Sequence, residues 1–391
     1  MDPIQNPYRP GAGTRPLVLA GREAEIEKAK HLLLSVRAGA PQRSLMLYGL
    51  RGVGKTVLLN HVESLAEELG FQIEHVEMSE TDDFRRVIAK SVRKVLLGIS
   101  TFENLKDKAR RALGILKAFS IAIPGGPELK IDVDAVVGVA DSGDLDSDVV
   151  DLIVALGEAA QESAKPVCLL IDEVQYLSEK AVSGLIAASH RISQKGYPVV
   201  FVCAGLPQVA ALAGDARSYA ERLFEFIPIS TLKAGAAEQA LLGPAQERGV
   251  QYEDRAKDLV IKETEGYPYF IQEFGKHIWN VATSNPVSEE EAQTGRSLAI
   301  ESLDQSFFKV RIDRATKAEK QFMKAMAALG SGPYKMGDVA KKRGVEINSL
   351  GPVRATLIGK GFVYSPSHGL IDFSVPQFDA FIRRHFDEPE I

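Results

Sequence analysis

The sequence contains little that would indicate an extracellular or membrane protein. Only two of its 391 residues are cysteines, Cys168 and Cys203, and each lies within an apolar run. We expect both to be buried and reduced, and to form neither a disulfide nor a metal-binding pair. The N-terminal residues lack the basic and apolar regions of a signal peptide, and no run of about 18 apolar residues occurs. We therefore expect no membrane span and a location in the cytoplasm.

The chain also lacks a strong excess of charge of either sign. Its formal net charge is −5, and its charged fraction of 25% and hydrophobic fraction of 45% are ordinary for a soluble globular protein. A slightly acidic chain has no overall attraction to nucleic acid, so any such binding must be local. The length is sufficient for two or three domains, each with its own hydrophobic core.

A glycine-rich segment near residue 50 organises the rest of the chain. Gly49, Gly54, Lys55 and Thr56 complete the G-x-x-x-x-G-K-[ST] pattern of a phosphate-binding P-loop, between a predicted strand at 45–48 and a predicted helix from Thr56. Glycines let successive backbone N–H groups face an anion, and the helix adds the positive end of its dipole. The residues that we expect to bind ATP here are Gly49, Leu50, Arg51, Gly52, Val53, Gly54, Lys55, Thr56 and Val57.

Individual roles follow from the same chemistry. Lys55 is expected to contact the β- and γ-phosphates, and the Thr56 hydroxyl is expected to ligate Mg²⁺. A second apolar run, residues 167–171, ends in Asp172 and Glu173 and predicts a buried parallel strand that delivers two carboxylates to the ligand-binding edge of a sheet. Asp172 suits a magnesium ligand acting through water, and Glu173 suits the base that activates the attacking water.

Strands alternate with helices over the first part of the chain. Further strands are predicted at 71–77, possibly an edge strand in view of its alternating pattern, at 198–205 and at 223–229. The fold class is therefore α/β, a P-loop NTPase parallel sheet with a helical lid, followed by a C-terminal winged helix-turn-helix. The predicted parts are an extended segment near the nucleotide (1–20), the P-loop core (21–232), the lid (233–287), a connector helix (288–312) and the winged helix-turn-helix (313–391).

Residues 100–150 are interpreted as an insertion in the core. Residues 119–123 and 129–133 flank a Pro124-Gly125-Gly126-Pro127 turn and predict a hairpin. Five aspartates between Asp141 and Asp151 have a spacing that could suggest calcium. They lack the central glycine and the twelfth-position glutamate of an EF-hand loop, so a solvated, helix-capping loop is favoured.

The last part of the chain predicts three helices and a hairpin. Helices are expected from a capping box at Thr316 and Glu319, over 336–343 and over 348–360, followed by strands at 362–364 and 370–373. Residues 313–391 carry a net charge of +3, whereas the rest carries −8. The basic residues that could face duplex DNA are Lys341, Lys342, Arg343, Arg354 and Lys360. The alternative is that this module contacts only protein.

Taken in order, these motifs resemble those of AAA+ ATPases, over residues 15–385. Within that class the chain is similar to the initiator-type branch (origin-recognition and cell-division-control proteins) and to bacterial and archaeal ATPases near the STAND group. The segments that carry the resemblance are Gly21-Arg22-Glu23, the P-loop, Asp172-Glu173, Arg222 and the Gly266-Tyr267-Pro268 motif. The resemblance implies that Arg22 and its neighbours line the adenine pocket, and that Arg222 is an arginine finger offered to a neighbouring subunit of a nucleotide-dependent oligomer.

The chain departs from that family pattern at two positions. The predicted strand at 198–205 runs into Leu206-Pro207-Gln208, where a γ-phosphate sensor is expected, which leaves Gln208 as a candidate. Tyr269 stands where initiator-type proteins place a sensor arginine. Two hypotheses remain: an ATPase that couples nucleotide state to DNA association or assembly, favoured by Glu173, or a STAND-like signalling switch with slow or negligible hydrolysis, favoured by the departures and the G-x-P motif.

Overall fold

The computed structural model describes all residues except 41, 100–105, 124–132, 211–212, 214–219 and 387–391. Contacts within the chain divide it into two compact units, each described here by itself. The first unit comprises residues 1–21, 50–54 and 230–391, and the second comprises residues 22–49 and 55–229. The tip of the predicted P-loop therefore groups with the C-terminal part of the chain.

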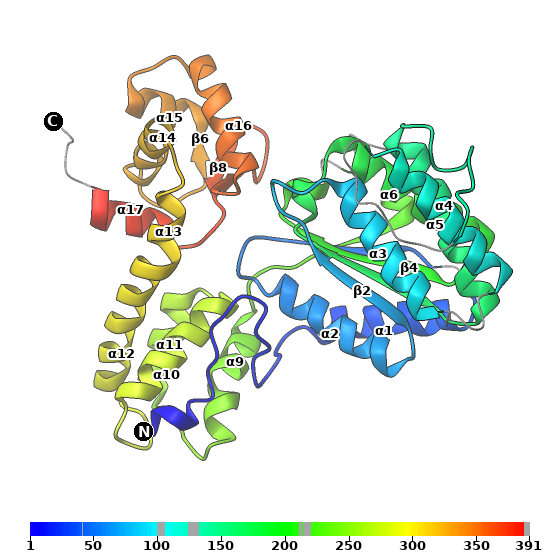
Figure 1. The fold of residues 1–391 in the computed structure, drawn as a ribbon. Coiled ribbons are helices and arrows are strands. Elements are labelled where there is room, and N and C mark those ends of the chain that lie inside the picture. The colour runs from blue at the N-terminus through cyan, green and yellow to red at the C-terminus, as the bar shows by residue number, and fades with distance from the viewer. Residues whose placement is uncertain (41, 100–105, 124–132, 211–212, 214–219, 387–391) are drawn as a thin grey trace. The chain divides into compact units, whose positions relative to one another are not determined.

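A five-stranded parallel sheet forms the centre of the second unit (Figure 1). The strands are β1 (Ser44–Tyr48), β2 (Gln72–Glu77), β3 (Val167–Asp172), β4 (Val199–Gly205) and β5 (Phe224–Pro228), in the order β2-β3-β4-β1-β5. β3 and β4 are buried along their whole length, as their uninterrupted apolar runs predict. β2 lies at one edge and is only partly buried, which confirms the edge position that its alternation predicted.

Helices cover both faces of this sheet. Figure 1 shows α1 and α2 on one face and α3 to α6 on the other, and the side chains of α3 to α6 form one large apolar cluster with the sheet. The bounds are α1 (Glu23–Arg37), α2 (Lys55–Glu68), α3 (Phe84–Ile99), α4 (Asp107–Ile121), α5 (Leu145–Ser163), α6 (Glu179–Lys195) and α8 (Ala220–Leu223). Cys168 and Cys203 are buried free thiols, and burial raises the pKa of Cys168 to about 12. They are reduced core residues, as expected.

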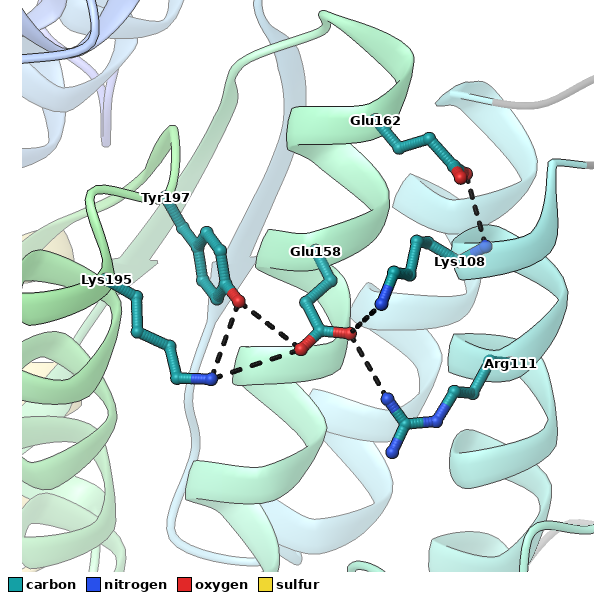
Figure 2. Close-up of polar contacts among 6 residues, drawn as sticks. All are labelled: Lys108, Arg111, Glu158, Glu162, Lys195 and Tyr197. Carbon is teal, nitrogen blue, oxygen red and sulfur yellow. Dashed lines mark hydrogen bonds and ion pairs between the residues drawn. The ribbon is translucent and has the colours of Figure 1, made fainter.

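The hairpin predicted for residues 119–133 is wrong in its first strand. Phe119 and Ile121 belong to the last turn of α4, and the Pro-Gly turn with most of the second strand lies outside the described residues. α4 packs beside α5, and Figure 2 shows their polar link, centred on the Glu158 carboxylate. The groups around this carboxylate are Lys108 Nζ at 3.3 Å, Arg111 Nη1 at 3.2 Å, Tyr197 Oη at 3.3 Å and Lys195 Nζ at 4.0 Å.

The aspartate-rich segment differs from the predicted solvated, helix-capping loop, because Asp146, Asp148 and Asp151 lie within α5 and the N-cap residue Asp144 makes no side-chain capping hydrogen bond. Asp148 is buried and accepts hydrogen bonds from the backbone N–H of Ser142 at 3.0 Å, the Ser142 hydroxyl at 2.7 Å and the backbone N–H of Gly143 at 3.0 Å. Asp146 accepts from the Ser183 hydroxyl of α6. In the described ranges no group of three or more His, Cys, Asp or Glu side chains is placed to hold a metal ion.

The first unit contains the N-terminal segment, a helical bundle and the C-terminal elements. The bundle and connector are α9 (Ala234–Gln246), α10 (Asp254–Thr264), α11 (Pro268–Val281), α12 (Glu289–Ser302), a π-helical turn (Leu303–Phe308) and α13 (Lys309–Ile312). Ser288 and Glu291 form a capping box at the start of α12. Among the described residues, no helix is both long and apolar enough to cross a membrane.

The C-terminal elements also follow the predicted order. They are α14 (Lys317–Ala327), β6 (Tyr334–Lys335), α15 (Met336–Arg343), a 3-10 turn (Ile347–Leu350), α16 (Gly351–Gly359), β7 (Val363–Tyr364), β8 (Leu370–Phe373) and α17 (Phe378–Phe386). The three strands form an antiparallel sheet in the order β6-β8-β7. The predicted hairpin is thus present, while β6 and α17 were not predicted.

The N-terminal segment is anchored on the helical bundle. Tyr8 is buried, its hydroxyl donates to the carbonyl of Leu241 at 2.5 Å, and its ring lies against Gly275 of α11. A Cβ at position 275 would come 2.4 Å from Tyr8 Cδ1. We therefore predict that Gly275→Ala lowers the free energy of unfolding by about 1–3 kcal/mol, the usual cost of overpacking. Urea denaturation measures the change.

A second glycine supplies the matched control for this prediction. Gly235 of α9 has nothing within 4 Å of its would-be Cβ. Gly235→Ala should therefore leave stability unchanged or raise it by up to about 1 kcal/mol, because alanine loses less backbone entropy in a helix. If Gly275→Ala unfolds at the urea concentration of the parent, the close packing of Tyr8 on α11 is not present in solution.

Candidate nucleotide-binding site

The P-loop lies between β1 and α2. β1 ends at Tyr48, and the Gly49 N–H donates to the carbonyl of Gly205 in β4 at 3.1 Å, which continues the sheet by one residue. Gly52 and Gly54 have φ angles of 81° and 96°, a region that strains any residue with a Cβ. α2 then begins at Lys55. Gly52 and Gly54 therefore stand where the backbone of the loop requires glycine.

Lys55 is held inside the loop and not extended into solvent. Its side chain is buried, and Nζ donates to the carbonyl oxygen of Gly49 at 3.0 Å. A buried ammonium is costly unless it is paired with acceptors. Phosphate oxygens would supply such acceptors, which is what the P-loop prediction requires of this lysine.

Thr56 and Asp172 lie against each other at the ends of α2 and β3. The Thr56 hydroxyl donates to Asp172 Oδ2 at 2.6 Å, and the Glu173 N–H donates to Asp172 Oδ1 at 2.8 Å. Burial raises the pKa of Asp172, and the hydrogen bonds from Thr56 and Glu173 oppose that rise. A hydroxyl and a buried carboxylate that face one another are the oxygen donors that Mg²⁺ prefers, so these residues fit that ion.

Glu173 follows Asp172 in a strained backbone conformation. Its φ and ψ are 55° and 39°, the left-handed region that costs a residue other than glycine about 1–2 kcal/mol. Such outliers concentrate at functional sites. The Glu173 carboxylate accepts a hydrogen bond from Gln175 Nε2, and Gln175 Oε1 accepts from the Leu206 N–H at 3.0 Å. Gln175 thus ties the acidic residue to the end of β4.

Sequence reasoning missed Gln175. The Leu206 N–H that it holds is the backbone of the segment in which we sought a γ-phosphate sensor. A polar residue two positions after the acidic pair was the only sequence signal, and nothing in the pattern indicated its partner on another strand. Gln208, the sensor candidate, is half-buried in the turn after β4.

The structure brings together Lys55, Thr56, Asp172 and Glu173 at one edge of the sheet, whereas Arg22 and Arg222 lie on other elements. Arg22 is buried at the N-terminus of α1. Burial lowers its pKa, and the negative charges of Glu25 and Glu23 oppose that change. Arg222 is exposed on α8, directly before β5. Val57 is half-buried in the first turn of α2.

In the first unit, the position compared with a sensor arginine holds an aromatic stack. The Tyr269 ring lies 4.9 Å from that of Phe307 and nearly parallel to it. The Arg311 guanidinium also lies over the Phe307 ring, with Cζ 3.9 Å from its centroid. Tyr269 therefore contributes packing at the start of α11.

Two family comparisons match parts of the chain. Residues 18–202 match the AAA ATPase domain family, and residues 305–382 match a family described as a domain of unknown function (DUF8462). No curated protein matches the chain in sequence.

Solved structures resemble the chain at low sequence identity. The Walker-type ATPase PABY2304 of Pyrococcus abyssi is 14% identical and superposes with a TM-score of 0.59, covering 96% of this chain and 98% of that one. RuvB of Thermotoga maritima (15% identity, 95% and 97% covered, TM-score 0.48) and Orc1 of Aeropyrum pernix in complex with DNA (16%, 95% and 94%, 0.46) superpose less well. At such identities the first of these supports the fold alone.

The family match and the geometry agree. The match covers the P-loop, Asp172 and Glu173, and these residues meet at the edge of a parallel sheet of five strands. Residues 18–202 therefore match the AAA ATPase domain family, and the sheet has the P-loop NTPase fold.

Proposed function

We propose that this protein binds ATP with Mg²⁺, hydrolyses it, and couples its nucleotide state to DNA association or to assembly. One observation carries the proposal: the Thr56 hydroxyl and the Asp172 carboxylate meet at 2.6 Å, with Glu173 next along the chain. The stability of the fold does not require a buried carboxylate opposite the first turn of α2. A cation bound to the nucleotide does require oxygen ligands at this position.

Each residue then has a definite task. The P-loop N–H groups and Lys55 hold the phosphates, and Thr56 and Asp172 hold Mg²⁺, which when bound neutralises charge on the phosphate oxygens. Glu173 accepts a proton from the attacking water. Gln175 fixes the Glu173 carboxylate by hydrogen bonding to it, and its other end is fixed by the Leu206 N–H.

Two arginines complete the proposal. Buried Arg22, at the start of α1, would line the adenine pocket. Exposed Arg222 on α8 would act on the nucleotide of a neighbouring subunit, as an arginine finger does. The exposure of Arg222 is consistent with that role, because a finger that acts across an interface must be accessible in the single chain.

The C-terminal elements could bind duplex DNA as a winged helix-turn-helix. Lys341 and Lys342 are exposed in the last turn of α15, beside half-buried Arg343. Three of the five candidates are already engaged: Lys360 pairs with Glu319 at 2.9 Å, Arg354 donates to the Ser365 hydroxyl at 2.6 Å, and Arg343 donates to Gln321 Oε1 at 3.0 Å. Lys341 and Lys342 are therefore the stronger part of the DNA proposal.

We predict that changing Lys341, Lys342 and Arg343 together to alanine weakens binding to duplex DNA and reduces its salt dependence. Each phosphate contact contributes about 0.9 to the slope of log affinity against log salt. The slope should therefore flatten by roughly two to three, while ATP hydrolysis without DNA stays at the parent rate. Fluorescence anisotropy at several salt concentrations measures the slope.

The control for this prediction removes two lysines from α14, exposed Lys317 and half-buried Lys320. Lys317→Ala and Lys320→Ala together, on α14, should change the slope by less than about one. If the parent protein binds no duplex DNA even at low salt, the DNA proposal fails whatever the variants do.

A second candidate function, a nucleotide-gated signalling switch, is favoured by contacts inside the first unit. Arg384 and His385 of α17 both contact the Asp304 carboxylate of the connector, at 2.6 Å and 2.9 Å. The Phe308 ring of the connector stacks on Phe381 of α17 at 5.2 Å. A C-terminal module that is packed in this way onto the connector suits internal contacts and control of assembly more than DNA recognition.

One experiment separates the two candidates. ATP turnover is measured with and without duplex DNA, and mass in solution is measured with ADP and with a non-hydrolysable ATP analogue. Turnover that DNA stimulates supports the ATPase coupled to DNA. Negligible turnover, together with a mass that depends on the nucleotide, supports the switch.

A further inference from the structure

The helix that joins the bundle to the C-terminal elements changes its register at the π-helical turn. α12, this turn and α13 follow one another without a break (Figure 1). Before the turn, the Leu303 N–H donates to the Ala299 carbonyl, four residues back. Across the turn, the Lys309 N–H donates to the Asp304 carbonyl, five residues back. The turn therefore holds one residue more than the same turn of an α-helix would.

The extra residue is accommodated on the exposed side of the helix. Gln305 and Ser306 are exposed. Asp304 and Phe308, on either side of them, are buried. The Ser306 hydroxyl donates to the Ser302 carbonyl at 2.6 Å, the acceptor that the Ser306 N–H uses in a regular α-helix. Single π-helical turns of this kind are rare and occur frequently at functional sites.

The two phenylalanines that end the turn pack on different parts of the first unit. Phe307 stacks on Tyr269 of α11, with the ring centroids 4.9 Å apart. Phe308 stacks on Phe381 of α17, with the centroids 5.2 Å apart. The turn thus lies between a contact with the helical bundle and a contact with the C-terminal elements.

A buried carboxylate at the start of the turn holds the register that the structure has. Arg384 Nε donates to Asp304 Oδ2 at 3.0 Å, and Nη2 donates to Oδ1 at 2.6 Å, the bidentate geometry in which arginine binds a carboxylate most strongly. His385 Nε2 lies 2.9 Å from the same Oδ2. Both partners belong to α17, beyond the turn. A change of register by one residue rotates the chain beyond the turn by about 100° and shifts it by about 1.5 Å, which would separate these groups.

We propose that the π-helical turn is a hinge with two registers, which sets the rotation of the C-terminal elements about the connector, and that the ion pair of Asp304 with Arg384 holds the observed register. In the second register the extra residue joins the α-helix, and the connector is α-helical throughout. The C-terminal elements then have two orientations on one bundle. The hinge needs no nucleotide, so it stands or falls independently of the proposed ATPase activity.

The test measures a distance across the hinge. Lys262 of α10 and Lys342 of α15 are exposed, and Lys262→Cys and Lys342→Cys together provide two sites for spin labels, because both native cysteines are buried. Pulsed electron paramagnetic resonance then gives the distances between the labels. Asp304→Asn removes the charge that holds Arg384 and keeps the size of the side chain. In this variant the share of a second distance should rise at least about tenfold over the parent, the usual effect of losing hydrogen bonds between charged groups.

Deletion of Gln305 removes the extra residue and keeps the register of the helix on both sides. Added to the Asp304→Asn protein, it should abolish the second distance and leave that of the parent. Made alone, it should leave the melting temperature at or above that of the parent. Deletion of Gln293, an exposed glutamine of regular α12, is the matched control. It should lower the melting temperature by roughly 10 °C, because it rotates Gly295 away from Ile278, which would lie 2.5 Å from a Cβ there.

Three results would overturn the hinge. One is an Asp304→Asn protein that shows only the distance of the parent. Another is a second distance that survives the deletion of Gln305, since the motion would then arise elsewhere. The third is a Gln305 deletion that destabilises as much as that of Gln293, since the extra residue would then be a fixed part of the fold. Arg384→Gln breaks the same ion pair from the other side and replaces Asp304→Asn if that variant does not fold.

Discussion

Replacing Lys55 with alanine should raise the Kd for ATP and ADP by at least about a hundredfold and leave no binding detectable at micromolar nucleotide. The side chain is buried at the start of α2, with Nζ 3.0 Å from the Gly49 carbonyl oxygen. A phosphate bound by the loop would receive charge-assisted hydrogen bonds from this ammonium, worth about 1.5–3 kcal/mol each. Two such bonds account for a hundredfold change or more.

The same variant should not unfold. Alanine favours helices, and removing a buried charge costs less than removing its partner would. Thermal unfolding without nucleotide checks this, and calorimetric titration measures binding. Lys30→Ala, which alters an exposed lysine of α1, should bind as the parent does. Unchanged ATP affinity in the Lys55→Ala protein would remove the P-loop assignment and, with it, the proposed nucleotide site.

The core of the fold was predictable because its signals are local. The inner strands β1, β3 and β4 are short apolar runs that end at a turn or a polar residue, and β3 and β4 are buried throughout, as such runs require. The capping box at Thr316 begins a helix at the predicted residue. For both the strands and the helix start, the residues that specify the element lie within it or within a few positions of it.

The hairpin error shows where local signals mislead. Residues 119–123 contain Phe119, Ile121 and Ile123, an alternation that resembles a strand. In α4 the buried positions include Ala112, Ile115, Leu116 and Phe119, which share one helical face, while Ile121 is 70% exposed. Packing of that face against α5 decided the structure, and a strand propensity over five residues was too weak to oppose it.

The residues of the candidate site also fall into those that local patterns predicted and those that they did not. Lys55, Thr56, Asp172 and Glu173 were predicted because each stands at a fixed offset within a short motif. Gln175 was not assigned a role, because its partner is distant in sequence: Leu206 lies 31 residues from Gln175. Which polar group meets which depends on the packing of the strands in the sheet, and a single sequence does not encode that in any local pattern.

Replacing Glu173 with glutamine should leave ATP bound and slow its hydrolysis by at least about a hundredfold, the usual effect of losing a general base. The amide can still accept the hydrogen bond from Gln175 Nε2, so the side chain keeps its place, but it cannot take a proton from water. The backbone demand is the same for both residues, since each must adopt the left-handed conformation found at this position. Stability without nucleotide should therefore change little.

Hydrolysis is measured as phosphate release at saturating ATP, and affinity is measured with a non-hydrolysable analogue. Glu179→Gln provides the control, because Glu179 is an exposed carboxylate in the first turn of α6 and lies only six residues further along. It should hydrolyse ATP within about twofold of the parent, as surface substitutions generally have small effects. Gln175→Ala should fall between the two, since Glu173 would remain a base but lose the contact that orients it. If Glu173→Gln releases phosphate at the parent rate, Glu173 is not the base, and the tie from Gln175 to Leu206 serves only to join β3 and β4.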